Sequence, residues 1–80
     1  MNGADFLKSK RITQARLAEE LKCARQNVSN WVSGKSSPSV ATIERITDAL
    51  KNLGVNTSYE EVFTALMNSR DEHKAKKQNF

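Results

Sequence analysis

The sequence has few of the residues that build disulfide frameworks, flexible linkers or membrane spans. Its 80 residues include one cysteine, one proline and three glycines. The lone Cys23 excludes an internal disulfide and fits a reducing compartment. No apolar run approaches the roughly 18 residues of a membrane span, and the N-terminal residues lack the apolar core of a signal peptide. We therefore expect one small domain in the cytoplasm, with no membrane association.

Acidic residues are missing from a long central stretch. The chain has nine acids, but none lies between Glu20 and Glu44. Residues 8–35 contain only two acids, Glu19 and Glu20. The bases of the same segment are Lys8, Lys10, Arg11, Arg16, Lys22, Arg25 and Lys35. A positive segment of this kind is typical of a surface that meets a polyanion, nucleic acid above all.

The patterns that mark enzymes are also absent. The sequence has no sign of a paired-carboxylate pocket, no nucleophile with a histidine partner, no glycine-rich phosphate loop and no metal-ligand cluster. We expect neither enzymatic activity nor a cofactor.

Helix signals recur along the chain, whereas the alternation typical of strands does not occur. Capping residues predict four helix starts, and the third helix is expected from about Arg25 to Ser33. The expected caps are Asn2, Thr13, Ser39 and Ser58, the last forming a capping box with Glu61, and the expected stops are Gly34 and Gly54. The predicted fold class is an all-α bundle of five helices.

Apolar residues at helical spacing predict the core. The expected buried residues of the second and third helices are Ala15, Leu17, Ala18, Leu21, Val28, Trp31 and Val32, and those of the last two are Val40, Ile43, Ile46, Thr47, Leu50, Leu53, Tyr59, Val62, Phe63, Leu66 and Met67. The stripe on the fifth helix is interpreted as core, with an added dimer contact as the alternative. Residues 1–69 are expected to form the domain, and residues 70–80 a polar, flexible tail; a helix extension or a phosphate-binding arm are the alternatives.

Two short helices around Lys22 have the pattern of a helix-turn-helix. Ala18 allows the helices to approach closely, and Val28 anchors the second one. The outward face of that second helix carries Arg25, Gln26, Asn27, Ser29, Asn30 and Ser33. Arginine can bind guanine with two hydrogen bonds, and glutamine or asparagine can do the same with adenine.

The segments TQARLAEEL, RQNVSNWVSGKSSPS and VATIERITDAL together resemble the phage-repressor and Cro-like, or Xre-type, helix-turn-helix family over about Ile12 to Gly54. The resemblance implies a lambda-repressor-like bundle whose third helix enters the major groove of DNA. It assigns base contacts to Arg25, Gln26, Ser29 and Asn30, and phosphate contacts to Gln14, Asn27, Lys35 and Ser36. The bases Lys8, Lys10 and Arg11 are either further DNA contacts or a solvated face.

Two positions depart from the family pattern. Lys22 stands where the family usually has glycine, and Ala24 stands where it often has a serine or threonine cap. Both departures concern the turn that places Arg25.

The resemblance implies a sequence-specific transcriptional regulator of double-stranded DNA, a repressor acting at an operator. We expect a homodimer that is weak until it binds DNA. The alternative is an antitoxin that binds a toxin partner and regulates its own gene through the same motif. A neighbouring toxin gene or a co-purifying partner favours the antitoxin.

Overall fold

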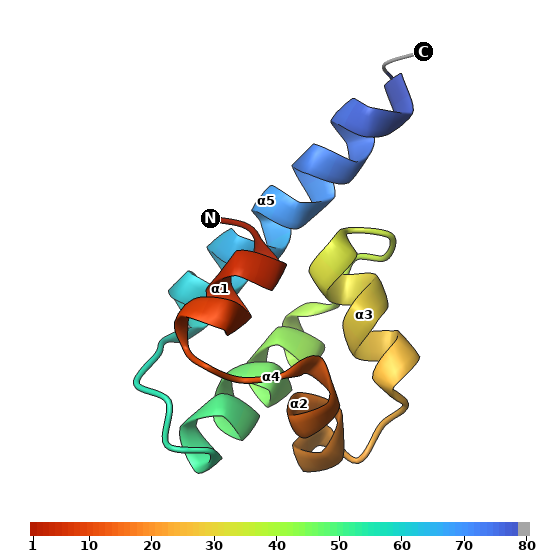
Figure 1. Cartoon of the computed structure of the whole chain (residues 1–80). Helices are drawn as coiled ribbons and strands as arrows, with labels where there is room; N and C mark the ends of the chain where they lie inside the picture. Colours follow the sequence, from red (N-terminus) through yellow and green to blue (C-terminus); the bar gives the residue numbers. More distant parts are fainter. Residues whose placement is uncertain (79–80) are drawn as a thin grey trace.

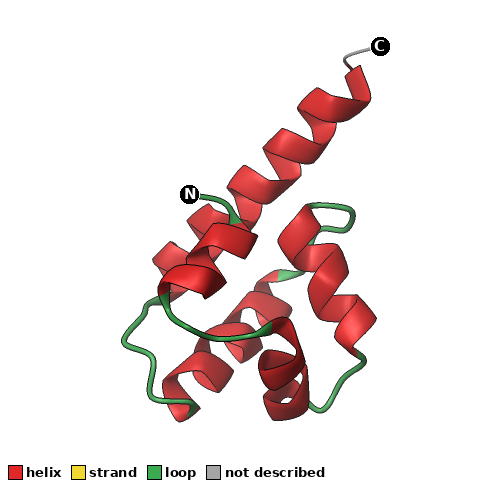
Figure 2. Ribbon diagram, viewed as in Figure 1, coloured by secondary structure: helices red, strands yellow, loops and turns green. Residues whose placement is uncertain are grey.

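The computed structural model describes the backbone of residues 1–78 and the side chains of residues 1–74. Within these residues the chain forms five helices and no strand (Figure 2), which confirms the predicted all-α class. The helices are α1 (Gly3–Ser9), α2 (Gln14–Leu21), α3 (Arg25–Ser33), α4 (Val40–Asn52) and α5 (Tyr59–Gln78). No helix in this part of the chain is both long and apolar enough to cross a membrane.

The predicted caps begin four of these helices. The side chains of Asn2, Thr13, Ser39 and Ser58 each accept a hydrogen bond from the backbone N–H three residues later, at 2.9–3.3 Å. The capping box at Ser58 is only half formed, because the Glu61 carboxylate instead lies 3.7 Å from the Lys10 Nζ and accepts from Thr57. Local capping chemistry therefore sets where these helices begin.

The first four helices are each followed by a residue with a positive φ. These residues are Arg11, Lys22, Gly34 and Gly54, with φ between 56° and 85°. After α2, the N–H of Lys22 donates to the Glu19 carbonyl at 3.2 Å, and the N–H of Cys23 donates to the Ala18 carbonyl at 3.1 Å. This pair of bonds is a Schellman turn, which satisfies carbonyl groups that the helix end would leave unpaired.

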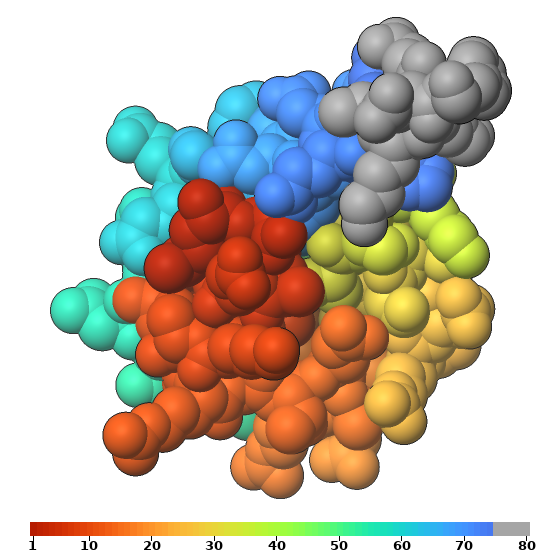
Figure 3. All heavy atoms as spheres, turned by 45° about the horizontal axis from the view of Figure 1, so that its top comes forward, coloured from red at the N-terminus to blue at the C-terminus, as the bar shows by residue number. Residues whose placement is uncertain are grey.

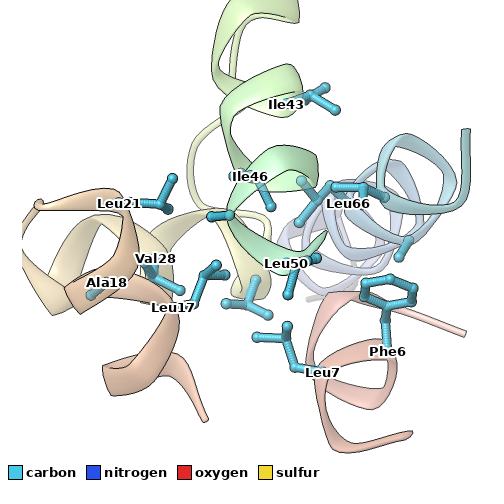
Figure 4. Close-up of a cluster of buried hydrophobic side chains, with 14 residues drawn as sticks. Phe6, Leu7, Leu17, Ala18, Leu21, Val28, Ile43, Ile46, Leu50 and Leu66 are labelled. Atoms are coloured by element: carbon cyan, nitrogen blue, oxygen red, sulfur yellow. The ribbon is translucent and has the colours of Figure 1, made fainter. Parts of the chain in front are cut away.

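The core lies where the helices converge, and all five contribute to it (Figure 4). Leu50 of α4 is fully buried at its centre, and Val28 and Val62 are each 1% exposed. The other buried apolar residues are Phe6, Leu7, Leu17, Ala18, Leu21, Val32, Ile43, Ile46, Ala49, Ala65 and Leu66. Trp31 and Tyr59, both expected in the core, are half-buried against this cluster, and so is Cys23.

Three residues predicted to be buried are exposed: Ala15, Val40 and Phe63. Val40 is the first residue of α4 and is 62% exposed. At about 100° per residue, Ala15 and Phe63 each lie roughly 110° from the middle of the buried arc of their helices. The predicted apolar stripes were therefore too wide, because a helix in a small bundle buries only the arc that its neighbours cover.

Helix α5 continues through Arg70 to Gln78, so the backbone has no break at the predicted start of the tail. It extends beyond the rest of the bundle (Figure 1), and the molecule measures 41 × 23 × 23 Å. No glycine or proline follows Arg70, and alanine, lysine and glutamate favour a helix there. The helix extension, one of the alternatives, is what the structure shows up to Gln78; flexibility of this segment stays a prediction, and residues 79–80 lie outside the described part.

Three hydrogen bonds tie the N-terminal residues to α5. The Asn68 Nδ2 donates to the Met1 carbonyl at 2.8 Å, and the Asn2 Nδ2 donates to Glu72 at 2.6 Å. Between them, the buried Ser69 hydroxyl accepts from the Gly3 N–H at 2.6 Å. Side chains spaced along just over one turn of α5 thus hold the start of α1.

Candidate nucleic-acid interface

Helices α2 and α3 pack against each other through small and branched apolar side chains. Ala18 of α2 is 4% exposed and Val28 of α3 is 1% exposed. Leu17, Leu21 and Val32 complete this buried seam. The packing fixes α3 on the bundle by its apolar face and leaves its polar face outward.

The turn between the two helices contains both departures from the usual pattern. Lys22 adopts the left-handed conformation, with φ 56° and ψ 44°. Ala24 precedes α3 in an extended conformation and supplies no side-chain cap. The turn therefore keeps its geometry although the two residues that usually favour it are missing.

The outward face of α3 brings the proposed base-contacting residues together. Arg25 and Gln26 are exposed, and Ser29 and Asn30 are half-buried one turn later. The Gln26 Nε2 donates to the Asn30 Oδ1 at 3.0 Å. This bond holds the Gln26 amide in one orientation, while its oxygen and second N–H stay available for an adenine edge.

A hollow at the start of α3 joins residues from three helices. Gln14 at the start of α2 and Arg25 at the start of α3 line it, together with Lys8 of α1 and the turn residue Thr13. The sequence left the role of Lys8 open because nothing in its local pattern separates a DNA contact from a solvated lysine. The fold places this cation beside two residues assigned to the interface.

Lys35 and Ser36 lie at the opposite end of α3, about 12 Å further along its axis. Both are exposed, and so is Asn27 on α3 itself. The Ser36 N–H donates to the Asn30 carbonyl at 3.3 Å, which closes the loop back onto α3. The residues assigned to phosphates thus lie on and beyond both ends of the proposed base-contacting face.

Gly34 brings the end of α3 against α5. A Cβ at this position would collide with the carbonyl oxygen of Ser69 and lie 2.8 Å from the Cα of Arg70. Only glycine permits this approach, and its φ of 84° also favours glycine. Helix α5 therefore supports the loop that carries Lys35.

Within the described residues, no three histidine, cysteine, aspartate or glutamate side chains are grouped so that they can hold a metal ion. The exposed chemistry of this surface is amide, hydroxyl and cationic. Such groups donate hydrogen bonds to phosphates and to base edges.

Comparison with known families agrees with this geometry. A family model described as helix-turn-helix matches residues 4–59, more than half of the chain. A search of curated proteins and a search of solved structures each gave no match. The family consists of DNA-binding regulatory domains and not of enzymes. The chain therefore belongs to the Xre/Cro-like helix-turn-helix family and is, in general terms, a DNA-binding transcription regulator.

Proposed function

We propose that this protein is a repressor that binds a specific double-stranded operator by inserting α3 into the major groove. The observation that carries the proposal is the outward face of α3, which holds Arg25, Gln26 and Asn30 in a stretch of 23 residues without an acid, 21–43. A solvated helix ordinarily carries glutamate and lysine on such a face. The absence of acids removes the repulsion that a groove lined by phosphates would exert.

Base contacts are assigned to the first half of α3. Arg25 is exposed and long enough to bind guanine O6 and N7. Gln26, oriented by Asn30 at 3.0 Å, presents its amide for adenine N6 and N7. Ser29 lies one turn after Arg25 and can donate to or accept from either kind of base pair.

Phosphate contacts are assigned to the two ends of α3. Gln14, with Lys8 beside it, binds the backbone at one end, and Lys35 and Ser36 bind it at the other. Asn27 adds a contact on the exposed side of the helix. Contacts of this kind set the position and orientation of the protein on the duplex without selecting its sequence.

A single helix of nine residues contacts only a few base pairs. Tight operator binding therefore requires two copies on a pseudo-palindrome, with their reading helices about 34 Å apart. A dimer seated on a promoter represses by blocking access of the polymerase to the same DNA.

The proposal is tested by selecting bound duplexes from a random pool. We expect a palindromic consensus whose half-sites are separated by about one helical turn. Enrichment of no consensus would contradict sequence-specific binding. A stoichiometric partner protein that co-purifies and is required for DNA binding would instead support the antitoxin.

A further inference from the structure

We propose that helix α5 carries a second phosphate-binding site, formed by Arg70 and Lys74, that extends the DNA contact of the loop after α3. The inference deepens the proposed function and depends on it. It assigns a DNA contact to a helix outside the helix-turn-helix and beyond residues 4–59 matched by the family model. The ligand is the phosphate backbone, so these residues add affinity without adding sequence preference.

Helix α5 contacts the loop after α3. The position of a Cβ on Gly34 is 2.6 Å from the carbonyl carbon of Ser69 and 2.8 Å from the Cα of Arg70. The loop and this turn of α5 therefore touch backbone to backbone. Lys35, which follows Gly34 directly, is assigned to a phosphate. The backbone of Arg70 therefore lies against Gly34, the residue that directly precedes the assigned phosphate contact Lys35.

Two cations of α5, Arg70 and Lys74, follow this contact along the helix. Arg70 is half-buried and lines a hollow together with Ser37 and Pro38 of the loop and with apolar side chains of α4 and α5. Lys74 is exposed and follows Arg70 by four residues, one turn further along the same face of α5. Figure 3 shows the loop after α3 (yellow-green) and the blue part of α5 next to each other on one side of the molecule. The two cations thus prolong the positive surface of the loop along the helix.

The same segment of α5 also carries acids. The Glu72 carboxylate accepts from Asn2 and is directed toward α1, and Asp71, the other acid of the segment, is exposed. Among the side chains up to Lys74, the ion pairs within 4.0 Å are Lys10–Glu61 and Arg16–Glu19. Neither pair involves Arg70 or Lys74, so both cations are available to an external anion. Lys76 and Lys77 follow in the sequence and increase the positive charge of this end of the chain.

The experiment measures DNA affinity against salt concentration for the wild type and the double variant Arg70→Ala/Lys74→Ala. Each lost phosphate contact lowers the slope of log K against log salt by about 0.9. Two contacts therefore lower it by about 2, and the affinity ratio of wild type to variant should rise about tenfold as salt falls from 200 to 50 mM. The base preference, measured on the same duplex pool, should not change. Arg70→Lys should keep the wild-type slope, because lysine also binds phosphate.

Lys51→Glu is the matched control, because it changes the net charge by the same two units. Lys51 is exposed in the last turn of α4, about 16 Å along that helix from Val40. If the control lowers the slope as much as the double variant does, the effect is one of overall charge and the site is overturned. A double variant that folds, as judged by circular dichroism, and keeps the wild-type slope also overturns it. Failure of the wild type to bind any duplex would overturn the proposed function itself. An unchanged slope in a variant that still binds DNA would overturn only the α5 site, so the two failures are distinguishable.

Discussion

Lys22 has a backbone conformation that costs a side chain more than it costs glycine. Its φ of 56° places it in the left-handed region. There the Cβ lies too close to the following carbonyl oxygen, and this repulsion costs about 1–2 kcal/mol. Its charge lies beyond the C-terminus of α2, where a cation is favoured by about 0.3–1 kcal/mol. The strain is larger than the charge effect. A lysine at this place therefore lowers stability relative to glycine.

We predict that Lys22→Gly raises the free energy of unfolding by about 1 kcal/mol, measured by urea denaturation. Lys22→Ala is the control, because it removes the charge and keeps the strained Cβ, and it should give no increase. If the alanine variant were stabilised as much as the glycine variant, the strain argument would be wrong. The same glycine variant should bind DNA with a smaller salt slope if Lys22 contacts a phosphate.

The hydrogen bond between Gln26 and Asn30 leads to a prediction about base selection. Gln26→Ala and Arg25→Ala should each cost about 1–3 kcal/mol on the selected operator and relax the preference at one base pair. Asn30→Ala should relax the preference at the Gln26 position too, since it removes the side chain that orients Gln26 at 3.0 Å. Binding profiles on a panel of single-base operator variants measure all three.

Asn27→Ala serves as the control for these substitutions. Asn27 is exposed on the same helix but is assigned to a phosphate. It should weaken binding equally on all operator variants. Unchanged profiles for all three base-contacting variants would show that another face of the protein selects the sequence.

Helices α3 and α5 are joined by a contact that only glycine permits, and Gly54 offers a comparison at the same backbone angle. Gly34 and Gly54 have φ of 84° and 85°. A Cβ on Gly54 would have nothing within 4 Å, whereas one on Gly34 would collide with the Ser69 carbonyl. The two positions therefore share the conformational cost of a side chain and differ only in packing.

We predict that Gly54→Ala lowers the free energy of unfolding by about 1–2 kcal/mol. Gly34→Ala should lower it by a further 1–3 kcal/mol or so, because the α5 backbone must move to admit the methyl group. Thermal and urea denaturation of both variants measure the difference. Equal losses would mean that the loop and α5 separate easily, and this would also weaken the assignment of Arg70 to the DNA surface.

Element starts and ends were predictable because they depend on neighbours in sequence. The caps at Thr13 and Ser39 and the stops at Gly34 and Gly54 require only a few adjacent residues. The extent of α5 was not predictable in this way. Local propensity permits a helix after Arg70 but does not require one, and the bonds to the N-terminus, such as that between Gly3 and Ser69, whose residues are 66 positions apart, hold α5 only at its Asn68–Glu72 turn.

In the candidate site, too, some features follow from the local sequence and others from tertiary contacts. The outward positions on α3 follow from helical periodicity, since Val28 and Val32 fix which face is buried. Lys8 and Arg70 come from the first and last helices, and their places beside Gln14 and Ser37 depend on the tertiary fold. Single-sequence patterns contain no signal for such tertiary contacts. From the sequence, these two residues were therefore basic side chains without an assigned role.

At the scale of the whole molecule, an exposed aromatic side chain on α5 is the feature that bears on assembly. Phe63 is 42% exposed and stacks on Tyr59, with ring centroids 6.1 Å apart. Beside it, the hollow between α4 and α5 that Arg70 also lines is formed by Pro38, Ile43, Phe63, Leu66 and Met67. An exposed aromatic next to an apolar hollow suits a second copy of the chain that is brought close by DNA.

We predict two chains per duplex when the protein saturates its selected operator, as measured by sedimentation. The free protein should stay monomeric at micromolar concentration, because the duplex holds both subunits at a high effective concentration that solution does not provide. Phe63→Ser should lower the cooperativity of binding to the full operator and leave the affinity for an isolated half-site unchanged. Lys51→Ala, on the exposed end of α4, should change neither. A complex with one chain per full operator at saturation would refute the dimer, and a repressor that reads a single site would then remain.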